Sequence, residues 1–262
     1  MGSEERCRAL CLIAFALDHH PRYRLLLIAN RDEFRDRGTS PAHFWSDAPD
    51  LLAGRDQLAG GTWLGITTEG KLAAITNYRD ARHQMTDPPS RGFLVAEYLR
   101  DPEMKPADLT TFLLKNGTTY DGFNLLYGTV HELHYFTNRG GSSGPVAAGI
   151  HALSNHLLDT RWPKVLTAKE RLNRILQQAA PSSDELFQAF TDPAPFADEL
   201  LPDTGIGPER ERFLSPLFID GDRYGTRTTT VIMVDREGGI TFLEQGHDSP
   251  GTPLRKFNFF LR

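Results

Sequence analysis

Apolar and polar positions alternate in blocks along the first thirty residues of the chain. Residues 11–17 and 23–29 are apolar runs of the length expected for buried strands. The connection between them, residues 18–22, is short, polar and contains a proline, so the two runs predict an antiparallel hairpin. Such a hairpin places the beginning of its first strand beside the end of its second strand.

The rest of the chain predicts further strands and a set of helices. Residues 38–50, rich in proline and small polar residues, are expected to form a loop. Apolar runs predict strands at residues 62–67, 71–76, 123–129, 132–137, 228–235 and 240–244. Helical spacing and helix-start residues predict helices at residues 91–99, 107–115, 162–179 and 183–190. Strands toward both ends with helices between them indicate an α+β fold of two packed antiparallel sheets covered by helices.

The size and composition of the chain are those of one globular domain. Its 262 residues are enough for one sizeable core, and no Ser/Gly-rich or charged linker divides them. A net charge of −5 without a Lys/Arg cluster gives no reason to expect nucleic-acid binding, and no apolar run approaches the length of an integral membrane segment. The two cysteines, Cys7 and Cys11, indicate a reducing compartment, so we expect a cytoplasmic protein. The oligomeric state stays open.

Four polar residues, Asn30-Arg31-Asp32-Glu33, directly follow the second apolar run. One interpretation is a strand that emerges into a solvated loop, where Arg31 and Glu33 offset each other's charge. The other is a site, because the predicted hairpin brings Cys11 close to Asn30 and Asp32. A thiol, a carboxylate and an amide at one end of a hairpin can form a nucleophile with its positioning groups. Against this, Cys11 also suits a small buried apolar position at the start of a strand.

The sequence around these residues resembles the NRDE-motif family, also called the transport and Golgi organisation family. The resemblance rests on a series of short motifs in one order: Cys11-Leu12-Ile13, Ala29-Asn30-Arg31-Asp32-Glu33-Phe34, Leu52-Ala53-Gly54-Arg55-Asp56, Gly60-Gly61-Thr62-Trp63-Leu64-Gly65, Thr76-Asn77-Tyr78-Arg79, Gly122-Phe123-Asn124-Leu125-Leu126 and Ser154-Asn155. It runs from Cys11 almost to the C-terminus.

The chain is also similar to the N-terminal-nucleophile (Ntn) amidases of the choloylglycine-hydrolase-like group, in which a catalytic cysteine precedes a strand ending in Asn-x-Asp. This similarity implies an Ntn-hydrolase-like αββα sandwich, with Cys11 as nucleophile and Asp32 as the catalytic aspartate. It implies oxyanion-binding roles for Asn77 and Asn155 and a late catalytic arginine at Arg227. Without the resemblance, the two asparagines suit turns at strand ends, and Arg227 suits a surface charge.

The implied activity is hydrolysis of a non-peptide C–N amide or acyl bond, such as a thioester, in a small molecule. The Cys11 thiolate attacks the carbonyl, and neither a metal nor a cofactor is needed. We expect five residues to contact the substrate: Asn30, Arg31, Glu33, Trp63 and Tyr78. In this class the base is the α-amine of the nucleophile itself, which Asp32 orients.

That mechanism needs a free α-amine on Cys11, but ten residues, Met1 to Leu10, precede Cys11 in the sequence. An amide bond to Leu10 would leave Cys11 without this base. Three explanations stay open. The leader 1–10 is removed by self-cleavage before Cys11. Or Leu10 is the true start, a leucine-type codon read as the initiator methionine, so that the domain spans 11–262. Or the leader is retained and the protein is not a hydrolase of this type. We favour the second, because the leader has no pattern of its own.

A non-catalytic function is the alternative. The family resemblance implies roles in haem handling or in acyl-CoA and lipid homeostasis, in which the same fold holds haem or an acyl-CoA as a carried ligand. The histidine pairs at residues 19–20 and 131–134 match no metal-site spacing and are expected to be solvated.

Overall fold

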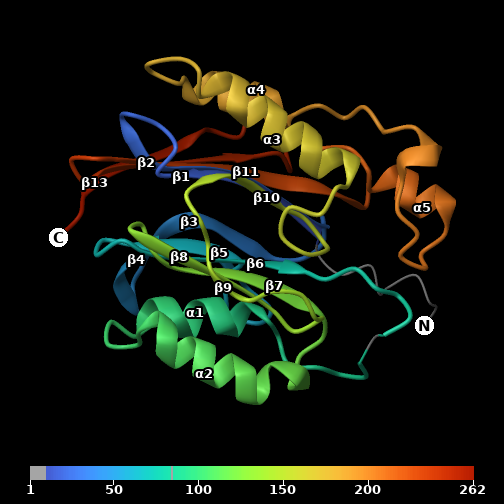
Figure 1. Cartoon of the computed structure of the whole chain (residues 1–262), viewed down its shortest axis with the longest axis horizontal. Coiled ribbons are helices and arrows are strands. Elements are labelled where there is room, and N and C mark those ends of the chain that lie inside the picture. Colours follow the sequence, from blue (N-terminus) through green and yellow to red (C-terminus); the bar gives the residue numbers. More distant parts are fainter. Residues whose placement is uncertain (1–9, 84) are drawn as a thin grey trace.

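The computed structural model describes residues 10–83 and 85–262, and these form four layers: helices, sheet, sheet and helices (Figure 1). The α+β prediction of an αββα sandwich is therefore confirmed. Of the predicted leader, residues 1–9 lie outside the described residues, and Leu10 is the first residue of strand β1.

The first sheet contains six antiparallel strands and includes the predicted N-terminal hairpin. Its spatial order is β10 (Gly149–Leu153), β1 (Leu10–Leu17), β2 (Tyr23–Phe34), β11 (Tyr224–Asp235), β12 (Gly239–Gly246) and β13 (Arg255–Phe260). The hairpin of β1 and β2 is confirmed, with Cys11 directly opposite Arg31 in the ladder. Strands β10 and β13 had no counterpart in the sequence-based prediction.

The second sheet contains seven strands. Its order is β3 (Thr39–Trp45), β4 (Ala48–Asp56), β5 (Leu64–Thr67), β6 (Lys71–Asn77), β7 (Phe123–Thr129), β8 (Glu132–Thr137) and β9 (Gly144–Pro145). Both predicted hairpins in this region are confirmed. The loop predicted at 38–50 is wrong, because most of it forms β3 and the start of β4. Strand β3 lies at the edge of the sheet, where Pro41 removes no bond from a central ladder.

Helices cover the outer face of each sheet. Helices α1 (Gly92–Arg100) and α2 (Pro106–Asn116) pack on the second sheet, and α3 (Pro163–Ile175) and α4 (Ser183–Phe190) pack on the first (Figure 1). The short helix α5 (Pro208–Phe213) and two 3₁₀ turns, Gly117–Thr119 and Asp198–Leu200, complete the described part of the chain. Among the described residues, no helix is both long enough and apolar enough to cross a membrane.

Alternation along β2 decides which side chains enter which core. Leu27 and Ala29 belong to the apolar core between the two sheets, whereas Leu26 and Ile28 belong to the core beneath α3 and α4. Successive side chains of a strand point to opposite faces. The polar residues at the end of β2 therefore divide in the same way: one pair continues the face between the sheets, and the other continues the face toward the helices.

Candidate functional site

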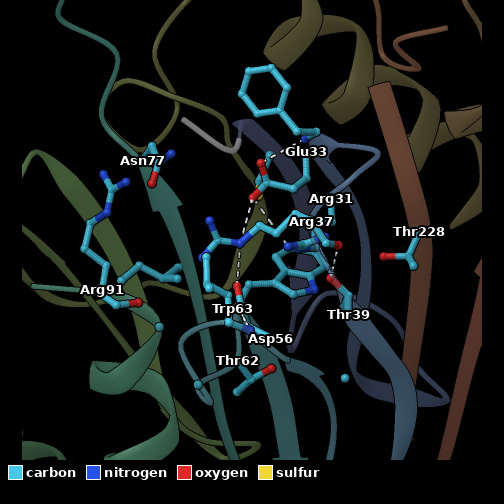
Figure 2. A pocket seen from close by; sticks show the side chains of 18 of the residues that line it. Arg31, Glu33, Arg37, Thr39, Asp56, Thr62, Trp63, Asn77, Arg91 and Thr228 are labelled. Atoms are coloured by element: carbon cyan, nitrogen blue, oxygen red, sulfur yellow. Dashed lines mark hydrogen bonds and ion pairs between the residues drawn. The ribbon is translucent and has the colours of Figure 1, made fainter. Parts of the chain in front are cut away.

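A cavity of about 520 Å³ lies at the end of β2 and is lined by residues from both sheets. This volume is within the range of small-molecule sites. Five of the residues predicted from the sequence line it: Cys11, Arg31, Glu33, Trp63 and Asn77. Figure 2 shows Arg31 and Glu33 in the middle of the view, with Asn77 and Arg91 on one side and Thr228 on the other.

Cys11 is buried in the wall of this cavity, with only 3% of its surface exposed. Because its ladder partner is Arg31, its side chain shares the face of the sheet that carries Arg31 and Glu33. Burial raises the pKa of the Cys11 thiol well above its ordinary value, and the nearby Asp32 carboxylate raises it further. The thiol is therefore neutral at physiological pH until another group takes its proton.

Asp32 is fully buried and lies on the opposite face of β2, toward the helices. Its Oδ1 accepts a hydrogen bond of 2.7 Å from Thr226 Oγ1, and its Oδ2 accepts none within residues 10–83 and 85–262. Burial raises the pKa of Asp32 to about 6, although Lys164 and Thr226 both favour the ionised form. Its partner in the β1–β2 ladder is Leu10, the residue that directly precedes Cys11.

Lys164, which the sequence did not single out, is a second buried ionisable group near Asp32. It lies in the first turn of α3, where lysines usually reach solvent, so no local pattern indicates its burial. Its Nζ donates to the Leu214 carbonyl at 2.9 Å. Burial lowers the pKa of Lys164 to about 8, and Asp32 opposes that change. Two buried ionisable groups, Asp32 and Lys164, therefore lie near each other in a desolvated environment.

Asn30 also faces the helices and is fully buried. Its Nδ2 donates to the carbonyl oxygens of Phe190 at 2.9 Å and Leu217 at 2.8 Å, and its Oδ1 accepts from Thr229 Oγ1 at 2.8 Å. These bonds connect the first sheet to the end of α4 and to the segment before β11. The lining of the cavity does not include Asn30.

Arg31 and Glu33 begin a row of charges along the cavity. Arg31 Nη2 lies 3.4 Å from Glu33 Oε2, and Arg37 Nε lies 3.7 Å from the same oxygen. Arg37 in turn contacts Asp56 at 2.7 Å. Arg31 Nη1 has no hydrogen-bond partner among the residues that the structure describes. The row is close to electrically balanced, but one guanidinium nitrogen at the cavity stays unused.

Asn77 is the last residue of β6 and lines the cavity, whereas Asn155 lies outside the lining and contacts the backbone of Asn77. Asn155 Nδ2 donates to the Asn77 carbonyl at 3.1 Å. Ser154 Oγ lies 3.0 Å from Asn155 Oδ1 and 3.1 Å from the Cys11 carbonyl oxygen. The Ser154–Asn155 segment therefore joins the end of β6 to the beginning of β1, which fixes Asn77 and Cys11 relative to each other.

The other two predicted residues, Arg227 and Tyr78, lie outside the lining of the main cavity. Arg227 is the extra residue of a β-bulge in β11, and its Nε and Nη2 donate to Asp248 at 2.9 and 2.6 Å. It lines a smaller adjoining cavity of about 150 Å³. The Tyr78 hydroxyl contacts His156 Nε2 at 2.7 Å.

Several lining residues were missed in the sequence: Arg37, Asp56, Thr62, Arg91, Thr228 and Glu244. A signal existed for Glu244, since it continues the alternation of Ile240 and Phe242, which face the core between the sheets. Burial raises the pKa of Glu244. Arg91 reaches the cavity because Gly92 packs against the backbone of Gly61, where a Cβ on Gly61 would lie 2.6 Å from the Gly92 carbonyl carbon. Such tertiary contacts leave no local pattern.

Comparisons with known proteins agree on one family and one fold. A sequence profile of the family "Transport and Golgi organisation 2" matches residues 10–249. The mouse Transport and Golgi organization 2 homolog is 35% identical over 257 residues, covering 90% of this chain and 92% of its own. The corresponding protein of Drosophila melanogaster is 29% identical over 275 residues, with the same coverage. A mutant of the conjugated bile acid hydrolase from Clostridium perfringens matches the structure with a TM-score of 0.51 at 8% identity, covering 95% and 92% of the two chains.

Proposed function

The chain belongs to the Transport and Golgi organisation 2 family, and from this premise we propose that it is a cysteine hydrolase of the Ntn type. Its substrate is a small molecule containing an amide or thioester bond. The observation that carries the proposal is the position of Cys11, in the wall of a cavity of about 520 Å³ that Asn77 also lines. Asp32, with its raised pKa, lies on the strand paired with that of Cys11.

In the proposed reaction, Cys11 Sγ attacks the carbonyl carbon and a C–S bond forms as the thiol proton passes to a base. Collapse of the tetrahedral intermediate breaks the C–N or C–S bond of the substrate, and the base returns the proton to the leaving group. Water then hydrolyses the acyl-enzyme and releases the carboxylic acid. The raised pKa of the thiol makes the base essential, because little thiolate exists before substrate arrives.

The proposed base is the α-amine that Cys11 gains if the bond between Leu10 and Cys11 is broken or never made. Leu10 pairs with Asp32 in the ladder, so that amine would form next to the residue whose carboxyl group can hold it. Asp32 Oδ2, which accepts no hydrogen bond from the described residues, is a fitting acceptor for an ammonium group. Asp32 must be ionised to bind the ammonium group in this way.

Asn77 is the proposed donor to the oxyanion. Its side chain lines the same cavity as Cys11, and Asn155 holds its backbone carbonyl. One such donor contributes about 3 kcal/mol of barrier lowering, or 10²–10³-fold in kcat. Asn155 acts through Asn77 and is therefore a positioning residue.

The test begins with the intact mass and N-terminal sequence of the protein made in its native host. The proposal expects a chain that begins at Cys11 and hydrolyses members of an amide and thioester panel. Cys11→Ala should remove all turnover while the far-UV circular dichroism stays unchanged.

Retained turnover in Cys11→Ala would overturn the proposal. If the chain keeps its leader and binds haem or an acyl-CoA saturably without turnover, the carrier function replaces it. The Cys11→Ala variant separates the two outcomes, because a carrier retains binding without its thiol unless the sulfur itself holds the ligand.

A further inference from the structure

Three side chains form a row across the face of the first sheet that lines the cavity. Cys11 of β1 pairs with Arg31 of β2, and Arg31 pairs with Thr228 of β11. Residues directly opposite each other in neighbouring strands point to the same face. The bulge at Arg227 makes this row, since it lets Thr226 face Asp32 on one side of the sheet and Thr228 face Arg31 on the other.

Two polar atoms in this row lack partners. Arg31 Nη1 and Thr228 Oγ1 are buried, and neither makes a hydrogen bond within the described part of the chain. Both residues line the main cavity and the smaller adjoining cavity, so they lie where the two meet. Figure 2 shows the Thr228 hydroxyl turned toward Arg31. Buried polar groups in folded proteins are almost always hydrogen-bonded, so we expect a bound molecule to supply the acceptor that these two donors lack.

The charges around the pair select the chemistry of the missing partner. Arg31 already has the Glu33 carboxylate at 3.4 Å, and Glu244 lines both cavities at the same junction. The other cations at this junction, Arg227 and Arg255, are matched by Asp248 and Glu244, so the charges nearly cancel. A bound carboxylate would add an unmatched negative charge and meet repulsion from Glu33 and Glu244. An uncharged carbonyl oxygen accepts bonds from an N–H and an O–H without that repulsion. The missing partner is therefore a neutral acceptor.

We infer that Arg31 and Thr228 form a subsite for an uncharged carbonyl oxygen in the acyl part of the substrate. The inference rests on the proposed hydrolase function and names its substrate class: acyl groups that carry a second amide or ester carbonyl. Neighbouring strands lie about 4.8 Å apart, so the subsite is roughly 5–10 Å from Cys11. An acyl chain of about six carbons spans this distance.

Three amide probes of equal length test the subsite by isothermal titration calorimetry on Cys11→Ala protein, which lacks the proposed nucleophile and so cannot consume them. Hexanediamide ends in an uncharged carbonyl, hexanamide in a methyl group, and 6-amino-6-oxohexanoate in a carboxylate. We expect hexanediamide to bind this protein about tenfold more tightly than either of the others, and the variants below are made in the same background. Thr228→Val, which removes only the hydroxyl, should reduce this advantage to threefold or less. Thr230→Val is the matched control, because Thr230 lies on the same strand outside both cavity linings.

The p-nitroanilides of the same three acyl groups keep this inference separate from the proposed function. Selective binding of hexanediamide without any p-nitroaniline release would support the subsite and count against the hydrolase. Turnover with equal binding of all three probes, or with no measurable binding, would overturn the subsite and leave the hydrolase standing. Tightest binding of the carboxylate probe would also overturn the inference, because it requires a neutral acceptor.

Discussion

The two faces of β2 use adjacent residues for different purposes. Asn30 and Asp32 face the helices and are fully buried, and Asn30 is fully bonded to backbone carbonyls and a threonine. Arg31 and Glu33 face the cavity, where Arg31 Nη1 makes no hydrogen bond to any residue that the structure describes. The four-residue motif is thus two interleaved pairs. One pair faces the helical layer, and the other lines the cavity between the sheets.

The largest expected effect comes from Asp32, which faces the helices yet is proposed to serve the nucleophile. Asp32→Asn keeps the shape and the Thr226 contact but removes the charge that holds the base, so kcat should fall by about 10²–10⁴-fold. Steady-state kinetics with the best substrate of the panel measures it. Asp198→Asn is the control, since Asp198 forms an exposed pair with Arg212. A fall of less than threefold in Asp32→Asn would show that this face has no catalytic part.

Asn30→Ala should affect stability rather than binding. Removing the amide leaves two buried carbonyls and a threonine hydroxyl short of partners, so the free energy of unfolding should fall by about 2–4 kcal/mol in urea titration. Binding of hexanediamide should change by less than twofold in the folded variant. Asn173→Ala, the same change on the exposed side of α3, should stay within about 0.5 kcal/mol. A loss of binding without a loss of stability would erase the distinction between the two faces.

The smallest expected effect is a pH dependence with opposite signs for stability and activity. The pKa of Asp32 is raised from 3.8 to about 6, so its contribution to stability is fully present below 3.8 and is lost as the pH rises through 6. Activity rises over the same interval, because the ionised carboxylate holds the base. The difference in unfolding free energy between wild type and Asp32→Asn, measured from pH 4 to 8, isolates this group. A flat difference would contradict the raised pKa.

Local patterns in the sequence predicted the N-terminal hairpin and the polar end of β2, because apolar runs and a short turn determine both. They also predicted that Cys11 lies near Asp32, and the register shows the limit of that prediction. Cys11 is opposite Arg31, and Asp32 faces the other side of the sheet. The alternation along β2 already indicates which residues share a face, because Leu27, Ala29 and Arg31 are each two residues apart. A charged residue that continues a core-facing row indicates a site rather than a core position.

Other parts of the site depend on contacts that no local pattern carries. Asn155 meets Asn77 only after β10 joins the edge of the first sheet. Lys164 is buried by the packing of α3 on β1, although its own helix turn suggests exposure. The error at 38–50 has a different origin, because a composition rich in proline and small polar residues predicts a loop, whereas an edge strand tolerates such residues.

The central claim is that Cys11 forms a covalent acyl intermediate, and trapping that intermediate tests it most directly. The protein is incubated with the p-nitrophenyl ester of 6-amino-6-oxohexanoic acid, quenched in acid within seconds and examined by intact-mass and peptide-mass spectrometry. We expect a mass increase of one acyl group, located on the peptide that contains Cys11 and absent from Cys11→Ala. No adduct, or the same adduct in Cys11→Ala, would contradict it.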